Sequence, residues 1–382
     1  MNRGYVATYP LSTVKDWCLT RGVPYTALIP ERVGYTYGPC YGPEPGVGLP
    51  TAFEEPEAYI AEISDCEVVG GRGIVLTSDN RALLDSAFGP RADRFDLNDG
   101  ALTMIPGGVR VQAAGVSEQS IPEGILLQSF FASNYHHWIV EHLPRLLIVE
   151  MANVPPTVPM LVDGTAMAIE QLSDALRAVT DRPVIPLEWG VRYHVNRLIV
   201  PSQMFGTGPN LQRGLEVEIG DVTVSRLAIE WLRKRLAPTE PGKARIYIDR
   251  RAVMAPVRLL NGDDVERTFA DFGFETVHPA EMSFAEQRDV FGNAAYIAGE
   301  TSAAMTNVLL APSSTVMICM QARRWPLNIY ADLCTYGGQR NLFFVGEPAT
   351  GEADGTDGRT YQIGFRMDAD LLRNRLRDIL GG

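Results

Sequence analysis

The fold class of this chain is decided by one stretch, which reads Ala244-Arg245-Ile246-Tyr247-Ile248-Asp249-Arg250-Arg251. A short apolar run closed by three charged residues predicts a buried strand and its end. Three more such strands are expected along the chain, at residues 275–277, 294–298 and 315–320, with helical spacing between them. Because strands and helices alternate in this way, the sequence predicts an α/β fold with a parallel sheet and helices on both faces.

The helices between these strands are indicated by their capping residues. Asn261 is suited to cap the first helix, because its side chain can accept from a backbone N–H. Ser283 and Glu286 have the spacing of a capping box at the start of the second. A third helix is expected after the turn at residues 299–302, and residues 368–380 predict an amphipathic closing helix.

The first half of the chain has weaker periodicity. Residues 1–50 are rich in Pro, Gly and Tyr and predict an irregular segment with one short helix. Residues 59–84 hold short apolar runs split by turn residues and predict a β-meander of about four strands. Because residues 202–220 read as a loop, we expect two domains, residues 1–205 and 206–350, followed by a linker and the closing helix at 351–382.

Composition excludes several classes of protein. Of the 382 residues, 46% are hydrophobic and 21% charged, as in ordinary globular domains. The net charge of -12 disfavours a general nucleic-acid binder, which would be basic. The five cysteines show no C-x-x-C spacing, so neither a disulfide framework nor a structural zinc site is indicated. Without an apolar segment long enough to span a membrane, we expect a cytoplasmic protein; peripheral membrane association and homo-oligomerisation stay open.

The densest cluster of polar side chains lies at residues 133–145, which hold three of the five histidines. Asn134, or the serine before it, is suited to cap a helix on which His137 and Glu141 share a face. Such a pair is typical of a catalytic base, but a solvated surface pair has the same spacing, and the sequence leaves both open. Trp138 is expected to point into the core.

Spacing argues against a zinc site in this stretch. A zinc protease with the motif H-x-x-E-H needs its two histidines four residues apart. Here His137 and His142 are five residues apart, and the reverse motif H-E-x-x-H is absent. The best D-x-D candidate for a metal-bound diphosphate is Asp368-Ala369-Asp370, but its position predicts a helix cap. We therefore expect no essential metal ion, while a divalent one stays open.

Two turns at the ends of predicted strands suit an anion. Open α/β sheets bind ligands outside the carboxyl ends of their strands. Arg250 and Arg251 lie at such an end, where guanidinium groups suit a phosphate or diphosphate; a surface basic pair is the alternative. Glu300, Thr301 and Ser302 enter a helix, whose first backbone N–H groups favour an anion. Glu300 itself suits ribose hydroxyls or a helix cap, and neither a P-loop nor a dinucleotide-binding glycine motif occurs.

Together these motifs resemble glycosyltransferase family 61, which includes many bacterial capsular-polysaccharide proteins. Residues 134–145 are similar to the family's N-[YF]-x-H-W-x-x-E-x-L-P-R, and residues 246–251 to its I-Y-I-S-R-R. Residues 282–287 and 299–307 are similar to its M-S-F-x-E-Q and G-[PE]-H-G-[AS]-[GA]-L-x-N. The resemblance covers roughly residues 58–325.

The resemblance implies a GT-B-like fold, in which two Rossmann-like domains face a cleft and the first carries the β-meander. The N-terminal domain would hold the acceptor, the second the nucleotide sugar, and the closing helix would return toward the N-terminal domain. The implied reaction is an inverting transfer of a hexose or pentose from a nucleotide sugar, expected to be UDP-linked, to a glycan or other hydroxyl acceptor. Surface polysaccharide biosynthesis is the implied role, with no further cofactor required.

The resemblance also implies roles for individual residues. Either Glu141 or His137 would be the base, and Glu141 is preferred, with His137 orienting it. The positions expected to bind the donor and its diphosphate are Arg250, Arg251, Glu300, Thr301, Ser302 and Asn307. The positions expected to be acceptor-side or structural are Asn134, Tyr135, Trp138 and Arg145.

Two departures from the family pattern bear on function. Asp249 stands where the family usually has Ser, and Thr301-Ser302 stands where it usually has His-Gly. The missing histidine removes an expected donor contact. It favours an alternative function, a non-catalytic nucleotide- or carbohydrate-binding protein on a decayed transferase scaffold. The intact His137, Glu141 and Arg250 oppose this alternative.

Overall fold

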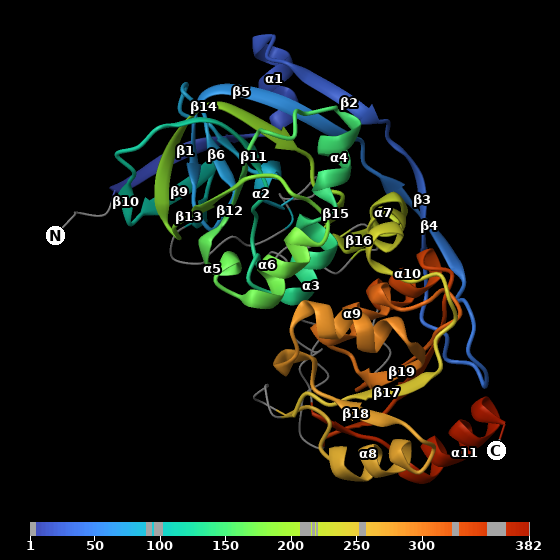
Figure 1. The fold of residues 1–382 in the computed structure, drawn as a ribbon. Helices are drawn as coiled ribbons and strands as arrows, with labels where there is room; N and C mark the ends of the chain where they lie inside the picture. The colour runs from blue at the N-terminus through green and yellow to red at the C-terminus, as the bar shows by residue number, and fades with distance from the viewer. Residues whose placement is uncertain are drawn as a thin grey trace. The chain divides into compact units, whose positions relative to one another are not determined.

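The computed structural model describes residues 5–88, 94, 102–206, 215, 218, 221–251, 257–322, 328–349 and 364–381. The chain forms two compact units, coloured along the chain in Figure 1. Unit 1 comprises Met1–Gly34 and Glu54–Ala228, and unit 2 comprises Tyr35–Phe53 and Ile229–Gly382. This division differs from the expected one at residues 205 and 206. The chain beyond residue 205 stays in unit 1 because β15 (Phe205–Gly206) pairs with β16 (Thr223–Val224).

Unit 1 is built on one 12-stranded mixed sheet. The strand order is β13-β12-β11-β14-β5-β6-β7-β1-β9-β8, with β10 paired to β14 and β2 to β5. The first four strands are mutually parallel, and β5 is antiparallel to β14. The strands are β1 (Tyr5–Ser12), β2 (Tyr25–Ile29), β5 (Ala58–Val69), β6 (Ile74–Leu76), β7 (Ala82–Leu83), β8 (Leu102–Ile105), β9 (Gly108–Ala113), β10 (Gly115–Val116), β11 (Ile121–Leu126), β12 (Met160–Asp163), β13 (Val184–Leu187) and β14 (Val191–Pro201).

The predicted meander is present as three strands rather than four. Its first two apolar runs join into the single 12-residue strand β5, which pairs in antiparallel fashion with β6, and β6 with β7. The N-terminal residues, expected to be irregular, add β1 to this sheet beside β7 and β9. The helices of unit 1 are α1 (Val14–Arg21), α2 (Asp85–Phe88), α3 (Tyr135–His137), η2 (Trp138–His142), α4 (Arg145–Met151), α5 (Gly164–Met167) and α6 (Glu170–Arg177), and α7 (Arg226–Leu236) spans the division.

Unit 2 confirms the predicted α/β alternation. Its sheet has five parallel strands in the order β18-β17-β19-β20-β21. These are β17 (Ala244–Ile248), β18 (Glu275–Val277), β19 (Ala294–Glu300), β20 (Val316–Gln321) and β21 (Arg340–Val345). The helices are α8 (Gly262–Ala270), η4 (Pro279–Glu281), α9 (Phe284–Gly292), η5 (Ala303–Leu310), α10 (Ile329–Tyr336) and α11 (Ala369–Leu380). Figure 1 shows α8 and α11 on one face of this sheet and α9 and α10 on the other.

The closing helix α11 packs within unit 2. Leu372 and Leu376, four residues apart on its apolar stripe, are fully buried in the same core as Phe269 of α8. This differs from the expected return toward the N-terminal domain, because the stripe is already covered here. A GT-B arrangement of the two units stays a prediction.

Besides β15 with β16, the described residues form two further two-stranded sheets: β3 (Arg32–Tyr37) with β4 (Pro50–Glu55), and β22 (Glu347–Pro348) with β23 (Phe365–Arg366). Among the described residues, no helix has both the length and the apolar character needed to cross a membrane.

Candidate functional site

The helix that follows β11 changes its winding within two turns. Asn134 caps it, as predicted, and its Oδ1 accepts from the backbone N–H of His136 at 2.9 Å. From Trp138 to His142 the helix is wound as a π-helix, in which the Leu143 N–H donates to the Trp138 carbonyl at 3.1 Å. Single π turns inside helices are frequent at functional sites, because they redirect side chains.

His137 and Glu141 meet across this turn, as their spacing predicted. The His137 Nδ1 lies 2.5 Å from the Glu141 Oε1. The two side chains differ in burial: His137 keeps 19% of its surface exposed, whereas Glu141 keeps 3%. A neutral imidazole that donates from Nδ1 to a carboxylate carries its lone pair on Nε2. The exposed ring of Phe131 stacks on His137, with centroids 4.8 Å apart.

Two other residues of the acceptor-side set, Trp138 and Arg145, are built into the core. Trp138 is fully buried, and its indole N–H donates to the Leu172 carbonyl at 2.9 Å. Arg145 is also buried and donates to the carbonyls of Pro201 at 2.8 Å and Gln128 at 3.2 Å. Burial lowers the pKa of Arg145 to about 10, and it raises the pKa of Tyr135. Arg145 therefore joins the chain beyond β11 to the end of β14.

A second histidine in this helix has a role that the sequence did not indicate. Burial lowers the pKa of His142 to about 4, so the ring stays neutral. Its Nδ1 lies 3.0 Å from the His137 carbonyl, which can only accept, so Nδ1 carries the proton. Its Nε2, 3.1 Å from the Ser129 Oγ, then accepts from that hydroxyl. His142 thus fixes the backbone of His137.

A second cluster lies in unit 2, at the carboxyl ends of β17 and β19. The strand order places these neighbours at the topological switch point, where doubly wound sheets bind ligands. Arg250 follows β17, and its Nε lies 3.4 Å from the Glu300 Oε1 at the end of β19. Arg258 approaches the same carboxylate, with Nε 3.8 Å from Oε2, and both arginines donate to the Thr301 carbonyl.

The positive charges of the Arg250 and Arg258 guanidinium groups repel one another. Burial lowers the pKa of Arg250, and the adjacent Arg258 cation lowers it further, while Glu300 opposes the shift. Burial likewise raises the pKa of Glu300, against the attraction of the two arginines. An anion bound here would therefore interact favourably with two cations that are already desolvated and positioned.

Arg251 lies in a different environment from its neighbour. Its guanidinium is held by Asp249 at 2.9 Å, and by Asp263 and Glu266 of α8. The hydrogen bond that Arg251 donates to Asp249 is the main cause of the raised pKa of Arg251, and the one to Glu266 adds to it. Because three carboxylates surround this guanidinium, the geometry favours a structural role for Arg251 rather than the expected contact with a diphosphate.

Asn307, also expected at the donor, lies in the core of unit 2. Its side chain is 1% exposed, and its Nδ2 donates to the Gln287 Oε1 at 3.0 Å. Gln287 in turn donates to the carbonyls of Pro279 and Met282. This network joins η5 to α9 and the turn before it, so the geometry favours a structural role for Asn307 as well.

The turn at Thr301 and Ser302 supports the arginines with its carbonyls. The Thr301 N–H, expected as an anion donor, donates instead to the Met320 carbonyl at 2.9 Å. The Tyr330 hydroxyl donates to the Ser302 carbonyl at 2.6 Å. Two buried oxygens beside the arginines, Ser302 Oγ and Glu300 Oε2, have no hydrogen-bond partner among the described residues. Such atoms are expected where a ligand supplies the missing partner.

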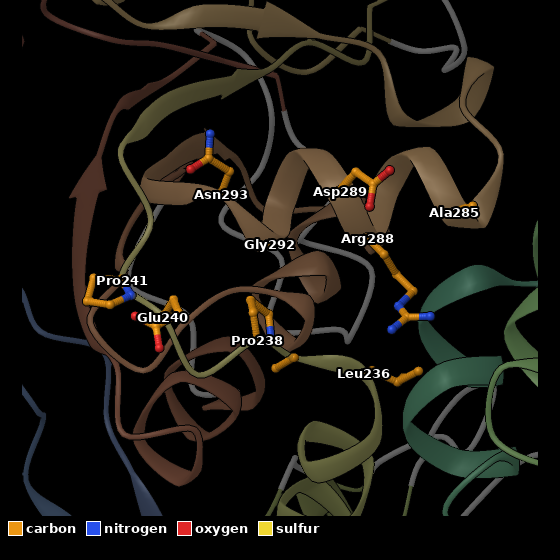
Figure 2. A pocket seen from close by; sticks show the side chains of 10 residues that line it. Leu236, Pro238, Glu240, Pro241, Ala285, Arg288, Asp289, Gly292 and Asn293 are labelled. Atoms are coloured by element: carbon orange, nitrogen blue, oxygen red, sulfur yellow. The ribbon is translucent and has the colours of Figure 1, made fainter.

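A separate hollow of unit 2 shares no residue with this cluster. Figure 2 shows Arg288 and Asp289 of α9 on one side and Glu240 and Pro241 of the α7–β17 connection on the other. The hollow lies where α9 leads into β19, at the amino end of that strand, whereas Glu300 ends it. In the described part of the chain, no group of three or more His, Cys, Asp or Glu is placed to hold a metal ion.

The sequence model of the glycosyltransferase 61 family matches residues 135–318, a little under half of the chain. The match includes the His137–Glu141 pair and the arginine cluster. It supports membership of this family and, with it, glycosyltransferase activity. The expected resemblance of residues 58–134 lies outside the match. No curated protein matches the chain.

Proposed function

We propose that this chain is an inverting glycosyltransferase in which Arg250 and Arg258 bind the diphosphate of a nucleotide-sugar donor. The observation that carries the proposal is the pair of buried guanidinium groups that share Glu300 at the switch point of a doubly wound sheet. As the bond to the sugar breaks, negative charge grows on the leaving diphosphate. Two preorganised cations stabilise that charge more than they stabilise the bound donor, and this difference accelerates the reaction.

The other residues of the cluster position these cations. Glu300 and the Thr301 carbonyl hold both arginines, so the carboxylate acts on the guanidinium groups rather than on ribose hydroxyls. The hydroxyl of Ser302, buried beside them without a partner among the described residues, is available to donate to a diphosphate oxygen.

The proposed base is His137, oriented by Glu141. The burial of the pair supports this order, because the carboxylate is enclosed while the imidazole keeps an exposed edge. The lone pair on Nε2 takes the proton of an acceptor hydroxyl, whose oxygen attacks the anomeric carbon from the side opposite the leaving group. The bond from that carbon to the diphosphate breaks, and the nucleoside diphosphate leaves with the electron pair.

The finer assignments rest on the family resemblance. They are a UDP-linked hexose or pentose donor, a glycan or other hydroxyl acceptor and a role in bacterial surface polysaccharide synthesis. A cytoplasmic location and independence from a divalent metal are also part of the proposal, and these two rest on the sequence itself. Turnover of a panel of nucleotide sugars, with and without a chelator, tests the donor and the metal together. Loss of turnover with the chelator would contradict metal independence.

The test of the diphosphate site is the variant Arg250→Ala. We expect donor turnover to fall about 100- to 1,000-fold, because a preorganised charge that stabilises the leaving group is lost. Arg258→Ala should also lower donor turnover, and it should weaken UDP binding. Arg267→Ala on α8, a guanidinium with 74% of its surface exposed, is the matched control and should match the parent protein.

The rival function is nucleotide or carbohydrate binding without transfer, which Thr301 in the place of the family histidine favours. Calorimetric titration with UDP, followed by release of UDP from donor sugars, separates the two. Binding without release or transfer would support the rival. Unchanged turnover in Arg250→Ala, with folding intact by circular dichroism, would remove the diphosphate assignment.

A further inference from the structure

Unit 1 carries an exposed tryptophan whose ring is contacted by an arginine. Trp189, in the turn after β13, keeps 47% of its surface exposed. The guanidinium carbon of Arg72 lies 4.8 Å from the centre of its ring. One face of the ring is therefore covered by a cation, and the exposed area remains for contact with solvent or a ligand.

Two interlocking turns fix this tryptophan. The Gly70 N–H donates to the Val191 carbonyl and the Gly190 N–H donates to the Gly70 carbonyl, both at 2.9 Å. A Cβ on Gly70 would lie 2.1 Å from the Glu188 carbonyl oxygen, and one on Gly71 would lie 2.5 Å from the Trp189 ring. The close approach of the two turns therefore requires glycine, and it preorganises the ring before any ligand binds.

The same guanidinium connects Trp189 to the His137 site. Arg72 lies 4.9 Å from the ring centre of Phe130, which in turn lies 6.2 Å from that of Phe131. Phe131 stacks on His137 and keeps 38% of its surface exposed. Given these three contacts, the exposed rings of Trp189 and Phe131 are at most about 16 Å apart.

Phe131 is held in a conformation that a bulky residue rarely adopts. Its φ is +59°, in the left-handed region, which is strained for a side chain with a Cβ. Its carbonyl accepts from the Asn134 N–H at 2.8 Å, which joins the turn to the start of the helix that carries His137. The strained turn presents the ring next to the proposed base.

We propose that Trp189 and Phe131 form a carbohydrate-binding strip on unit 1, which holds an acceptor glycan of more than one sugar. Pyranose rings expose C–H groups on one face, and these pack on aromatic rings, while their hydroxyls reach polar groups at the rim. Phe131 takes the sugar whose hydroxyl is activated by His137. Trp189 takes a sugar farther along the glycan. That the bound glycan is the acceptor rests on the proposed transferase function; that the strip binds a glycan does not.

The surroundings of the strip favour a neutral glycan over a nucleotide. The guanidinium of Arg72 contacts the rings of both Phe130 and Trp189 and donates to the Gly71 carbonyl at 2.9 Å, so its charge is already engaged within unit 1. Two carboxylates lie near these turns: Glu188, the exposed residue before Trp189, and the buried Asp163 at the end of β12, whose Oδ2 would lie 3.3 Å from a Cβ on Gly71. Carboxylates accept from sugar hydroxyls but repel phosphate.

The test is binding of the whole chain to an array of cellohexaose, xylohexaose, chitohexaose and mannan oligosaccharides, followed by calorimetry with the best probe. We expect Trp189→Ala and Phe131→Ala each to weaken that Kd about tenfold or more, since a stacking ring carries much of such an interface. Trp189→Phe should retain most of the affinity. Tyr35→Ala removes another exposed aromatic ring and is the control.

UDP binding and release of UDP from donor sugars report on the other proposal. Measured without an acceptor, both should be unchanged in Trp189→Ala, because Trp189 belongs to unit 1 and the proposed diphosphate site belongs to unit 2. Arg250→Ala should show the converse, with intact glycan binding and lost UDP release. The strip is overturned if no oligosaccharide binds the parent protein at millimolar concentration, if Trp189→Ala binds as well as the parent, or if Trp189→Ala loses uridine or UMP binding instead.

Discussion

The side chains of His137 and Glu141 show how burial assigns roles that spacing leaves open. On a helix the two residues share a face in either role. In the folded chain the carboxylate is enclosed and the imidazole is exposed, with 2.5 Å between Nδ1 and Oε1. A buried carboxylate that orients an accessible imidazole favours His137 as the base, which reverses the preference drawn from the sequence.

This reversal makes a direct prediction. His137→Ala should lower kcat for transfer about 100- to 10,000-fold, the usual contribution of a general base. Glu141→Gln keeps a hydrogen-bond acceptor beside Nδ1 and should lower kcat less, with the KM for the donor nearly unchanged in both variants. Transfer is measured with an acceptor that the parent protein uses. A Glu141→Gln variant that is inactive beside an active His137→Gln would show that Glu141 takes the proton.

The adjacent residues Arg250 and Arg251 show what side-chain chemistry alone can and cannot predict. Arg250 and Arg251 have the same side chain and follow the same strand, so the sequence assigns them one role. The fold separates them: α8 brings Asp263 and Glu266 to Arg251, while Arg250 meets Glu300. Arg258, a few residues further along the chain, and Tyr330, far from it in sequence, join the cluster with no motif around them, so no local pattern could indicate them.

At the level of elements, predictions succeeded where the signal is local. The capping box of Ser283 and Glu286 is formed as predicted, because both partners lie within one turn. The helix capped by Asn134 is also present, but its spacing did not indicate that it continues as a π turn from Trp138 to His142, both of which are buried. Sequence spacing predicted that a helix begins here, but it did not predict how that helix is wound.

Helix α10 contains a carboxylate whose ionisation is coupled to folding. Asp332 is fully buried, accepts from the Thr36 hydroxyl and the Tyr37 N–H, both at 2.6 Å, and has no ion pair in the described ranges. Burial raises its pKa from 3.8 to about 7. The folded chain therefore holds this proton more tightly than the unfolded chain. The stability that this proton contributes is fully present below about pH 4, and it is lost as the pH rises through 7.

Asp332→Asn should remove this loss, since the amide keeps an acceptor for Tyr37 and carries no charge. Between pH 5 and pH 8 the parent protein should lose on the order of a few kcal/mol more stability than the variant. Asp85 of unit 1, whose pKa burial raises to about 6, contributes the same trend to both proteins and cancels in the comparison. Thermal melts at both pH values measure the difference, and parallel shifts of the two proteins would refute the assignment.

At the level of the molecule, the sequence anticipated the alternating sheet of unit 2 but not its complete composition. Residues 35–53 have little periodicity, yet they belong to unit 2 across about 300 positions of sequence. The Cys40 N–H donates to the Asn341 side chain at 2.9 Å, and the Cys40 carbonyl accepts from Phe343 at 2.8 Å. The Gly46 N–H and carbonyl pair with the backbone of Asn341. This segment therefore covers the edge strand β21.

A fragment of residues 226–382 should for this reason fold poorly by itself. It would expose the unpaired edge of β21 and leave the buried Asn341 and Asp332 without the partners that residues 35–53 supply. Adding a synthetic peptide of residues 35–53 should raise the Tm of the fragment and reduce its aggregation. The same peptide with Thr36→Val lacks the hydroxyl that binds Asp332 and should rescue less. Equal folding with and without the peptide would show that unit 2 is complete without its N-terminal segment.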